Sequence, residues 1–107
     1  MIIIYHLINK MEQKQLYDAI IANNDNIVNK LLNDGVNPNT PLLYGYSALY
    51  WSILKGNFNI VKLIINKNYI PNDEEIIAAK NKGKFHKEIY QLVINGKNKN
   101  LPFIIEI

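Results

Sequence analysis

The feature that most constrains this chain is a sequence pattern that recurs at a fixed offset of about 33 residues. The stretch "GYSALYWSILKGNFNIVKLIINKNYIPN", residues 45–72, matches residues 12–39 when it is moved back by that offset. The matched pairs include Leu49 with Leu16, Ser52 with Ala19, Val61 with Val28, Pro71 with Pro38 and Asn72 with Asn39. A fixed period of this length is typical of proteins built from stacked structural repeats. At 107 residues, the chain is long enough for one such domain and too short for two.

The first repeating unit reads as a pair of helices. Apolar residues keep helical spacing over residues 12–23 and again over residues 26–33. Asn24 or Asp25 can cap the second helix, and Gly35 is placed to adopt the left-handed conformation that ends it. The sequence therefore predicts a helix, a tight turn, a second helix and a glycine stop.

The second unit repeats this order after a segment that breaks helical structure. Pro38, Pro41 and Gly45 predict an extended finger with a turn. A helix capped by Ser47 follows, and Gly56 separates it from a further helix over residues 58–66. Residues 36–72 are therefore expected to form a finger and another pair of helices.

The third unit has altered spacing. Ala79 follows Ser52 more closely than Ser52 follows Ala19, so that part of the finger is missing. Its first helix is expected to begin at the acidic run of residues 73–75 and to end at Gly83, and its second to run over residues 85–96 with Gly96 as the stop. The acidic run could also be read as metal ligands, but carboxylates at the positive end of a helix dipole explain it more simply.

These residues resemble the ankyrin repeat, a unit of about 33 residues whose first helix opens with T-P-L-H-x-A. The matching stretch is "SALYWS", residues 47–52, in which Ala48 and Tyr50 stand where the signature has proline and histidine. The ending "LLNDGVNPN", residues 31–39, matches more closely. The resemblance implies an all-α solenoid of helix-turn-helix units, with a finger between the first two. The chain then divides into repeats at about 12–39, 40–72 and 73–96 of a single domain over 1–107, flanked by segments 1–11 and 97–107.

Composition and motifs argue against several classes of protein. The net charge is +3, but the twelve basic residues are all lysines spread along the chain, and without arginine a nucleic-acid partner is not expected. Cysteine is absent, which excludes disulfides and thiolate metal sites. His6 and His86 lie near opposite ends of the chain, and no phosphate loop or nucleophile elbow is present. We therefore expect a protein that is not an enzyme and has no cofactor or metal.

The opening "MIIIYHLI" bears on location. It lacks the basic start and the small-residue cleavage site of a signal peptide, and no apolar run reaches membrane-spanning length. We expect no membrane partner and a cytoplasmic location. The heavy use of Ile, Asn, Lys and Tyr indicates an AT-rich coding sequence, so a viral or endosymbiont protein acting in a host cytoplasm is one form of this expectation.

The resemblance implies binding of another protein on a concave surface, formed by the finger and the exposed side of the first helices. Aromatic rings beside a lysine suit such contacts, because rigid rings bury much area at low entropic cost. For Tyr44 and Tyr46 the alternative is packing against Trp51, which is itself expected to be at least partly covered. The contact positions carried over from the family are Leu43, Tyr44, Tyr46, Leu54, Lys55, Asn81 and Lys82.

The two ends, "IIIYHLI" and "LPFIIEI", are apolar and lie outside the repeats. They could cap the stack, form short strands at the termini, or join two copies as a homodimer through residues 1–8 and 101–107. Leu101 and Pro102 also resemble the start of the F-box-like motif of poxvirus ankyrin proteins, although Glu106 comes later than that motif places its acidic residue. A self-associating assembly protein that uses these ends is therefore one alternative to the binding module. An inhibitor that occupies the cleft of an enzyme with its finger is another.

Overall fold

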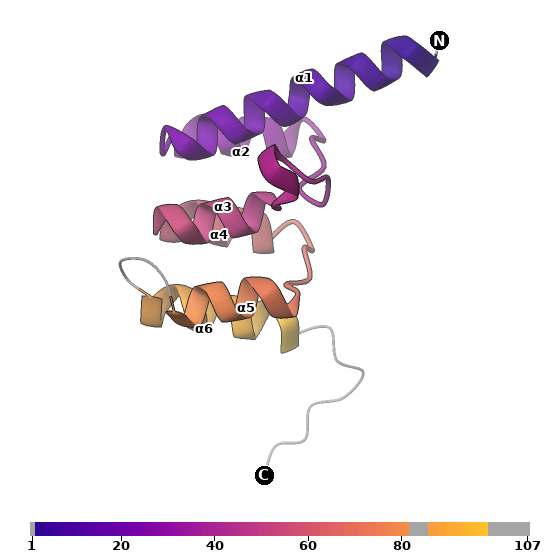
Figure 1. Ribbon diagram of the computed structural model, residues 1–107. Helices are drawn as coiled ribbons and strands as arrows, with labels where there is room; N and C mark the ends of the chain where they lie inside the picture. The colour runs from indigo at the N-terminus through magenta and orange to yellow at the C-terminus, as the bar shows by residue number, and fades with distance from the viewer. Residues whose placement is uncertain (1, 82–85, 99–107) are drawn as a thin grey trace.

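A computed structural model describes residues 2–81 and 86–98 of the protein. These residues form six α-helices and one 3-10 turn, without any strand. Figure 1 shows three helix pairs stacked on one another, with α1, α3 and α5 in one layer and α2, α4 and α6 behind them. The elements are α1 (Ile2–Ile21), α2 (Asp25–Asn33), the turn Leu43–Gly45, α3 (Ala48–Lys55), α4 (Phe58–Ile65), α5 (Asp73–Asn81) and α6 (His86–Asn98). The all-α solenoid predicted from the sequence is confirmed.

Four helices are directly preceded by a residue whose side chain accepts a hydrogen bond from a backbone amide in the first turn. This bond satisfies one of the amides that have no partner within the helix. Gly56, with φ of 66°, forms the left-handed turn between α3 and α4. The capping pairs are Asn24 with Ile27, Ser47 with Tyr50, Asn57 with Ile60 and Asn72 with Glu75.

The core follows the repeat. Leucine, isoleucine and valine side chains at matching positions of the first two pairs occupy equivalent, fully buried places. α1 packs against α2 and α3, α3 against α4 and α5, and α4 against α2 and α6. Each pair therefore buries its apolar face against a neighbour, as a stacked repeat must. The equivalent core pairs are Leu16 with Leu49, Ile20 with Ile53 and Val28 with Val61.

The amino-terminal segment differs from one of the expectations. Residues 2–8 are not a strand, because they continue the first helix, which therefore begins at Ile2 and not near Glu12. Figure 1 shows this end of α1 projecting beyond the rest of the stack. Residues 101–107 lie outside the part of the chain that the structure describes.

The expectation that Gly96 ends the last helix is wrong, because α6 continues to Asn98. Gly96 is buried, and a Cβ atom at this position would lie 2.8 Å from Cγ2 of Ile65 in α4. The glycine is therefore used for its small size, which lets α6 approach α4. Gly83, the other expected stop in this unit, lies outside the described residues.

Candidate functional site

The finger carries a tight turn with an exposed aromatic side chain at its tip. The Gly45 amide donates to the Leu42 carbonyl at 3.0 Å, and the Leu42 amide donates to the Tyr46 carbonyl at 2.8 Å. Between them, Tyr44 has a left-handed backbone with φ of 61°, and its side chain is 79% exposed. Only glycine, asparagine and aspartate adopt this conformation readily, so a tyrosine here is under strain.

Tyrosine rings gather around Trp51, which lies on α3 next to the finger. Tyr17 of α1 contacts it edge-on with ring centroids 5.2 Å apart, and Tyr46 does so at 5.8 Å. Tyr44 lies 6.4 Å away, and Tyr46 also stacks on Tyr50 at 4.5 Å. The indole nitrogen of Trp51 donates to the Leu43 carbonyl at 3.3 Å.

These contacts bear on two expectations. Trp51 is partly buried and packs against the core, as predicted. Tyr44 and Tyr46 pack against it and yet remain partly or largely exposed, so both interpretations of these tyrosines describe part of their surroundings. Their contact with a partner stays a prediction.

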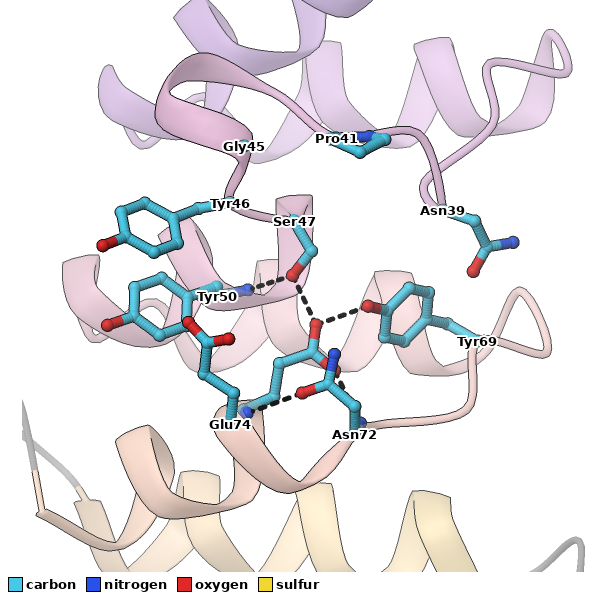
Figure 2. Close-up of a pocket in the computed structure, with 10 residues that line it drawn as sticks. Asn39, Pro41, Gly45, Tyr46, Ser47, Tyr50, Tyr69, Asn72 and Glu74 are labelled. Carbon is cyan, nitrogen blue, oxygen red and sulfur yellow. Dashed lines mark hydrogen bonds between the residues drawn. The ribbon is translucent and has the colours of Figure 1, made fainter.

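A buried carboxylate joins the second and third helix pairs. Glu75, at the start of α5, is only 1% exposed. Figure 2 shows Ser47, Tyr69 and Asn72 converging on its carboxylate. The hydroxyls of Ser47 and Tyr69 donate to one carboxylate oxygen, and the backbone amide of Asn72 donates to the other at 2.8 Å. The Asn72 side chain in turn accepts from the Glu75 amide at 2.9 Å, which completes a reciprocal cap.

The network places Ser47 and Tyr69 in structural roles. The Ser47 hydroxyl oxygen accepts a hydrogen bond from the Tyr50 backbone amide, and the same hydroxyl donates a hydrogen bond to Glu75. This side chain therefore caps α3 and connects it to α5. Burial raises the pKa of the Tyr69 hydroxyl above its usual range, and the hydrogen bond to Glu75 raises it further. The phenol therefore stays a hydrogen-bond donor at neutral pH.

The other two members of the acidic run do different things. Asp73 forms an ion pair with Lys97 of α6 at 2.8 Å, and this pair holds the pKa of Asp73 below its usual value. Glu74 is exposed and has no hydrogen-bond or ion-pair partner within the described ranges. With Glu75 in the helix cap, the capping interpretation of the run is supported. Residues 2–81 and 86–98 hold no group of three side chains suited to a metal ion.

Three hollows follow the finger and the first helices. One of about 390 Å³ lies between α1 and residues 41–43, and one of about 180 Å³ lies beneath the finger, lined by residues of the finger, α3 and the start of α5. A third, of about 330 Å³, lies between α3 and α5. Leu43, Tyr46 and Asn81 line the first, second and third hollow respectively.

The remaining predicted contact residues are more scattered. Lys55 lies at the far end of α3, where it lines a different hollow with Gly56 and Asn57. Because α3 has eight residues, this end is roughly 12 Å from the finger. Leu54 is partly buried on the same helix. Lys82 lies outside the described residues.

Three large side chains that line these hollows were not identified as contact residues from the sequence. Tyr17, Tyr50 and Ile77 occupy the same place in the first helix of the three pairs. Tyr17 lines the hollow at α1, and Tyr50 and Ile77 line the hollow between α3 and α5. The repeat offsets that aligned Ser52 with Ala79 also align Tyr50 with Ile77, so the signal was present.

The helices also bear on membrane association, since none in the described part of the chain combines the length and the hydropathy that a membrane span requires.

Comparison with protein-family models matches residues 16–102 to ankyrin repeats in three copies. Comparison with curated proteins and with solved structures gives no match. Ankyrin repeats are generally protein-protein interaction modules and are typically not enzymes. Because the matched segment is most of the chain and coincides with the stacked helix pairs, this protein belongs to the ankyrin-repeat family.

Proposed function

We propose that this protein is a non-enzymatic module that holds a partner protein on its concave surface, formed by the finger and the exposed side of α1, α3 and α5. The observation that carries this proposal is the backbone of Tyr44, with φ of 61° beneath a side chain that is 79% exposed. A non-glycine residue in this conformation costs about 1–3 kcal/mol, and such strain is concentrated at binding sites. A contact with Trp51 alone does not require a tyrosine at this position.

The surroundings of Tyr44 support the same surface. Leu43 is about half exposed beside it and borders the hollow against α1. Tyr17, Tyr50 and Ile77 continue the surface along the three first helices. Aromatic groups held rigidly by their neighbours are the residues that contribute most to protein interfaces. Inhibition of an enzyme would be one consequence of binding in this way.

A capture experiment tests the proposal with the variant Tyr44→Asn. Asparagine tolerates the left-handed conformation, so the variant should fold with unchanged or slightly higher stability but lose the ring. Immobilised wild-type protein and variant are compared for the proteins that they retain from a lysate. Tyr5→Asn is the matched control, because Tyr5 is similarly exposed but lies at the projecting end of α1.

We expect Tyr44→Asn to lose at least tenfold in partner affinity while Tyr5→Asn keeps it, since a central aromatic anchor contributes about 2 kcal/mol or more. The assignment to the concave surface is wrong if both variants retain the same partners equally. Circular dichroism and urea midpoints of each variant establish that the fold is kept.

A second candidate function is self-association, and the exposed end of α1 favours it. Seven apolar side chains around this end are exposed: Ile2, Ile3, Ile4, Tyr5, Leu7, Ile8 and Met11. A helix that is apolar around its whole circumference is normally buried. A second copy offers an identical apolar helix, and two such helices can pair about a two-fold axis.

Light-scattering mass over a concentration series tests this second proposal. The comparison is between wild type, the variant Ile4→Lys with Ile8→Lys, and the chain without residues 101–107. A mass that doubles in wild type and stays at 12.4 kDa in the lysine variant supports pairing through α1. A wild-type monomer at all concentrations removes self-association from consideration, and loss of the dimer only in the shortened chain assigns it to residues 101–107.

A further inference from the structure

The hollow between α3 and α5 differs in charge from the rest of this basic chain. The described residues that line it are Tyr50, Glu74, Ile77, Ala78 and Asn81, and none of these is a lysine. The neighbouring hollow beneath the finger shares Tyr50 and Glu74 and adds Glu75, and no lysine is among the described residues that line it. By contrast, the hollow at α1 has two lysines in its lining. Among the described residues, this part of the surface therefore carries more negative than positive charge, in a protein with a net charge of +3.

Within this negatively charged part of the surface, Glu74 is the carboxylate that can pair with a ligand. Asp18, Asp34 and Asp73 are each ion-paired with a lysine at 2.8 Å, and Asp25 and Glu75 accept hydrogen bonds from side chains. Glu74 has neither kind of contact with any residue of 2–81 and 86–98, and it is the one exposed carboxylate that lines these two hollows.

A flat aromatic side chain lines the same two hollows as this carboxylate. Tyr50 is fixed by stacking on Tyr46, with ring centroids 4.5 Å apart and an angle of 15° between the rings. Figure 2 shows Tyr50 between Tyr46 and α5, with the side chain of Glu74 rising from α5 toward the Tyr50 ring. A ring face beside a carboxylate is the arrangement that attracts a cation, and a guanidinium suits it best because it is planar and can contact both groups.

The rest of the lining suits the stem of such a side chain. Ile77 is more than half exposed on the next turn of α5 and offers apolar surface to methylene groups. Asn81 ends the hollow with an amide that can accept a further hydrogen bond. At about 330 Å³, the hollow is at the lower end of the range of about 300–1,000 Å³ for small-molecule pockets, a size that fits one side chain better than a cofactor.

We propose that this hollow takes an arginine or lysine side chain from a basic segment of the partner, with the cation between Tyr50 and Glu74 and the stem along Ile77. This inference rests on the proposed function, because it names the chemistry of the partner that the concave surface holds. Arginine is preferred over lysine, since only a guanidinium can stack on the ring and bind the carboxylate with two parallel hydrogen bonds.

Selection from a library of random dodecapeptides displayed on phage tests the inference. The immobilised targets are wild type, Glu74→Gln, Glu74→Lys and the control Glu88→Gln, in which the same change is made at an exposed site on α6 in the opposite layer. We expect wild type and Glu88→Gln to enrich arginine at one peptide position. Affinity for the selected peptides should fall about tenfold in Glu74→Gln, and Glu74→Lys should no longer select a basic residue.

The outcomes separate this inference from the proposed function. Peptides whose binding is lost in Tyr44→Asn but which carry no basic residue, or whose affinity is unchanged in Glu74→Gln, overturn the basic-segment inference and leave the concave surface as the binding site. Peptides whose binding depends on neither Tyr44 nor Glu74 overturn both. Because Glu74 is exposed and without a partner in the described structure, its substitution should leave the fold intact, which a thermal midpoint checks.

Discussion

The two halves of α1 belong to one continuous helix, yet the more apolar half is the one that stays exposed. Residues 2–11 contain more large apolar side chains than residues 12–21. In the first half Ile3 is 74% exposed, whereas in the second half Leu16 and Ile20 are completely buried. The difference lies in the neighbours, because the buried side chains of α1 all fall in the half that packs into the stack with α2 and α3.

This comparison shows what the repeat contributes. Leu16 and Ile20 are buried because equivalent residues of the next pair, Leu49 and Ile53, are buried against the same core. Residues 2–11 have no counterpart in the repeating pattern, and no second layer in the described part of the chain covers their apolar side chains. Hydrophobicity therefore does not bury a helix in a solenoid unless an adjacent unit supplies a matching face.

The largest effect that can test this comparison is the same substitution made in both halves. Ile20→Ala should lower the free energy of unfolding by about 2–5 kcal/mol, because it leaves a cavity among packed neighbours. Ile3→Ala should change it by less than about 0.5 kcal/mol. Urea denaturation at low protein concentration measures both, and Ile20→Val, with an expected loss of about 0.5–1.5 kcal/mol, serves if Ile20→Ala does not fold.

Equal losses in the two isoleucine variants would mean that the projecting half is covered in solution. Repeating Ile3→Ala at high protein concentration then sharpens the comparison, because a loss that appears only there would identify a second copy as the cover.

The next largest effect concerns two adjacent glutamates on α5 that differ as the two halves of α1 do. Glu75 is enclosed by Ser47, Tyr69 and Asn72, whereas Glu74 faces solvent. Glu75→Gln replaces an acceptor of three hydrogen bonds by a group with one acceptor atom, so it should cost about 1–3 kcal/mol. Glu74→Gln should cost less than about 0.5 kcal/mol. Urea midpoints at pH 7 compare the stability of the two variants. A loss of stability in Glu75→Gln no larger than that in Glu74→Gln would show that the network contributes little.

Much of the fold could be predicted from the sequence because the repeat, the capping residues and the core share one cause. The caps at Asn24 and Ser47 and the turn at Gly56 lie where the sequence placed them. The start of α1 could not be placed, since apolar residues before Glu12 suit a strand, a cap or a helix equally, and only an arrangement in space decides among them. The role of Gly96 could not be predicted for the same reason, because it depends on Ile65 of another helix.

Less of the candidate site could be predicted. The finger tyrosines were named, but the inter-repeat role of Glu75 was missed although the pattern Asn72-x-x-Glu75 is that of a reciprocal helix cap. Its contact with Ser47 joins one repeat to the next, and a local sequence pattern cannot predict a contact between residues 28 positions apart. Tyr50 was considered only as a departure from the family signature, which hid its place beside Glu74.

A smaller loss is expected at Gly96, where the approach of two helices depends on a missing side chain. Alanine favours a helix by about 1 kcal/mol over glycine, but its Cβ would lie 2.8 Å from Cγ2 of Ile65. We expect the overlap to outweigh the helix preference, so that Gly96→Ala destabilises the protein by about 1 kcal/mol net. A double-mutant cycle with Ile65→Ala measures the coupling, and a stabilising Gly96→Ala would show that α4 and α6 adjust at little cost.

The smallest effect is expected for an ion pair that lies in solvent, and it tests the exposed side of the comparison. Lys97 holds the pKa of Asp73 below its ordinary value, so the pair contributes stability above the unfolded pKa and loses it as the pH falls through the lower folded value. Because the Asp73 side chain is 89% exposed, Asp73→Asn should shift the urea midpoint less than any buried change above, and molar salt should remove the shift. A loss as large as that of Glu75→Gln, or one that persists in salt, would show that an exposed contact can matter as much as an enclosed one, and burial by a neighbouring repeat would no longer explain which residues hold this stack together.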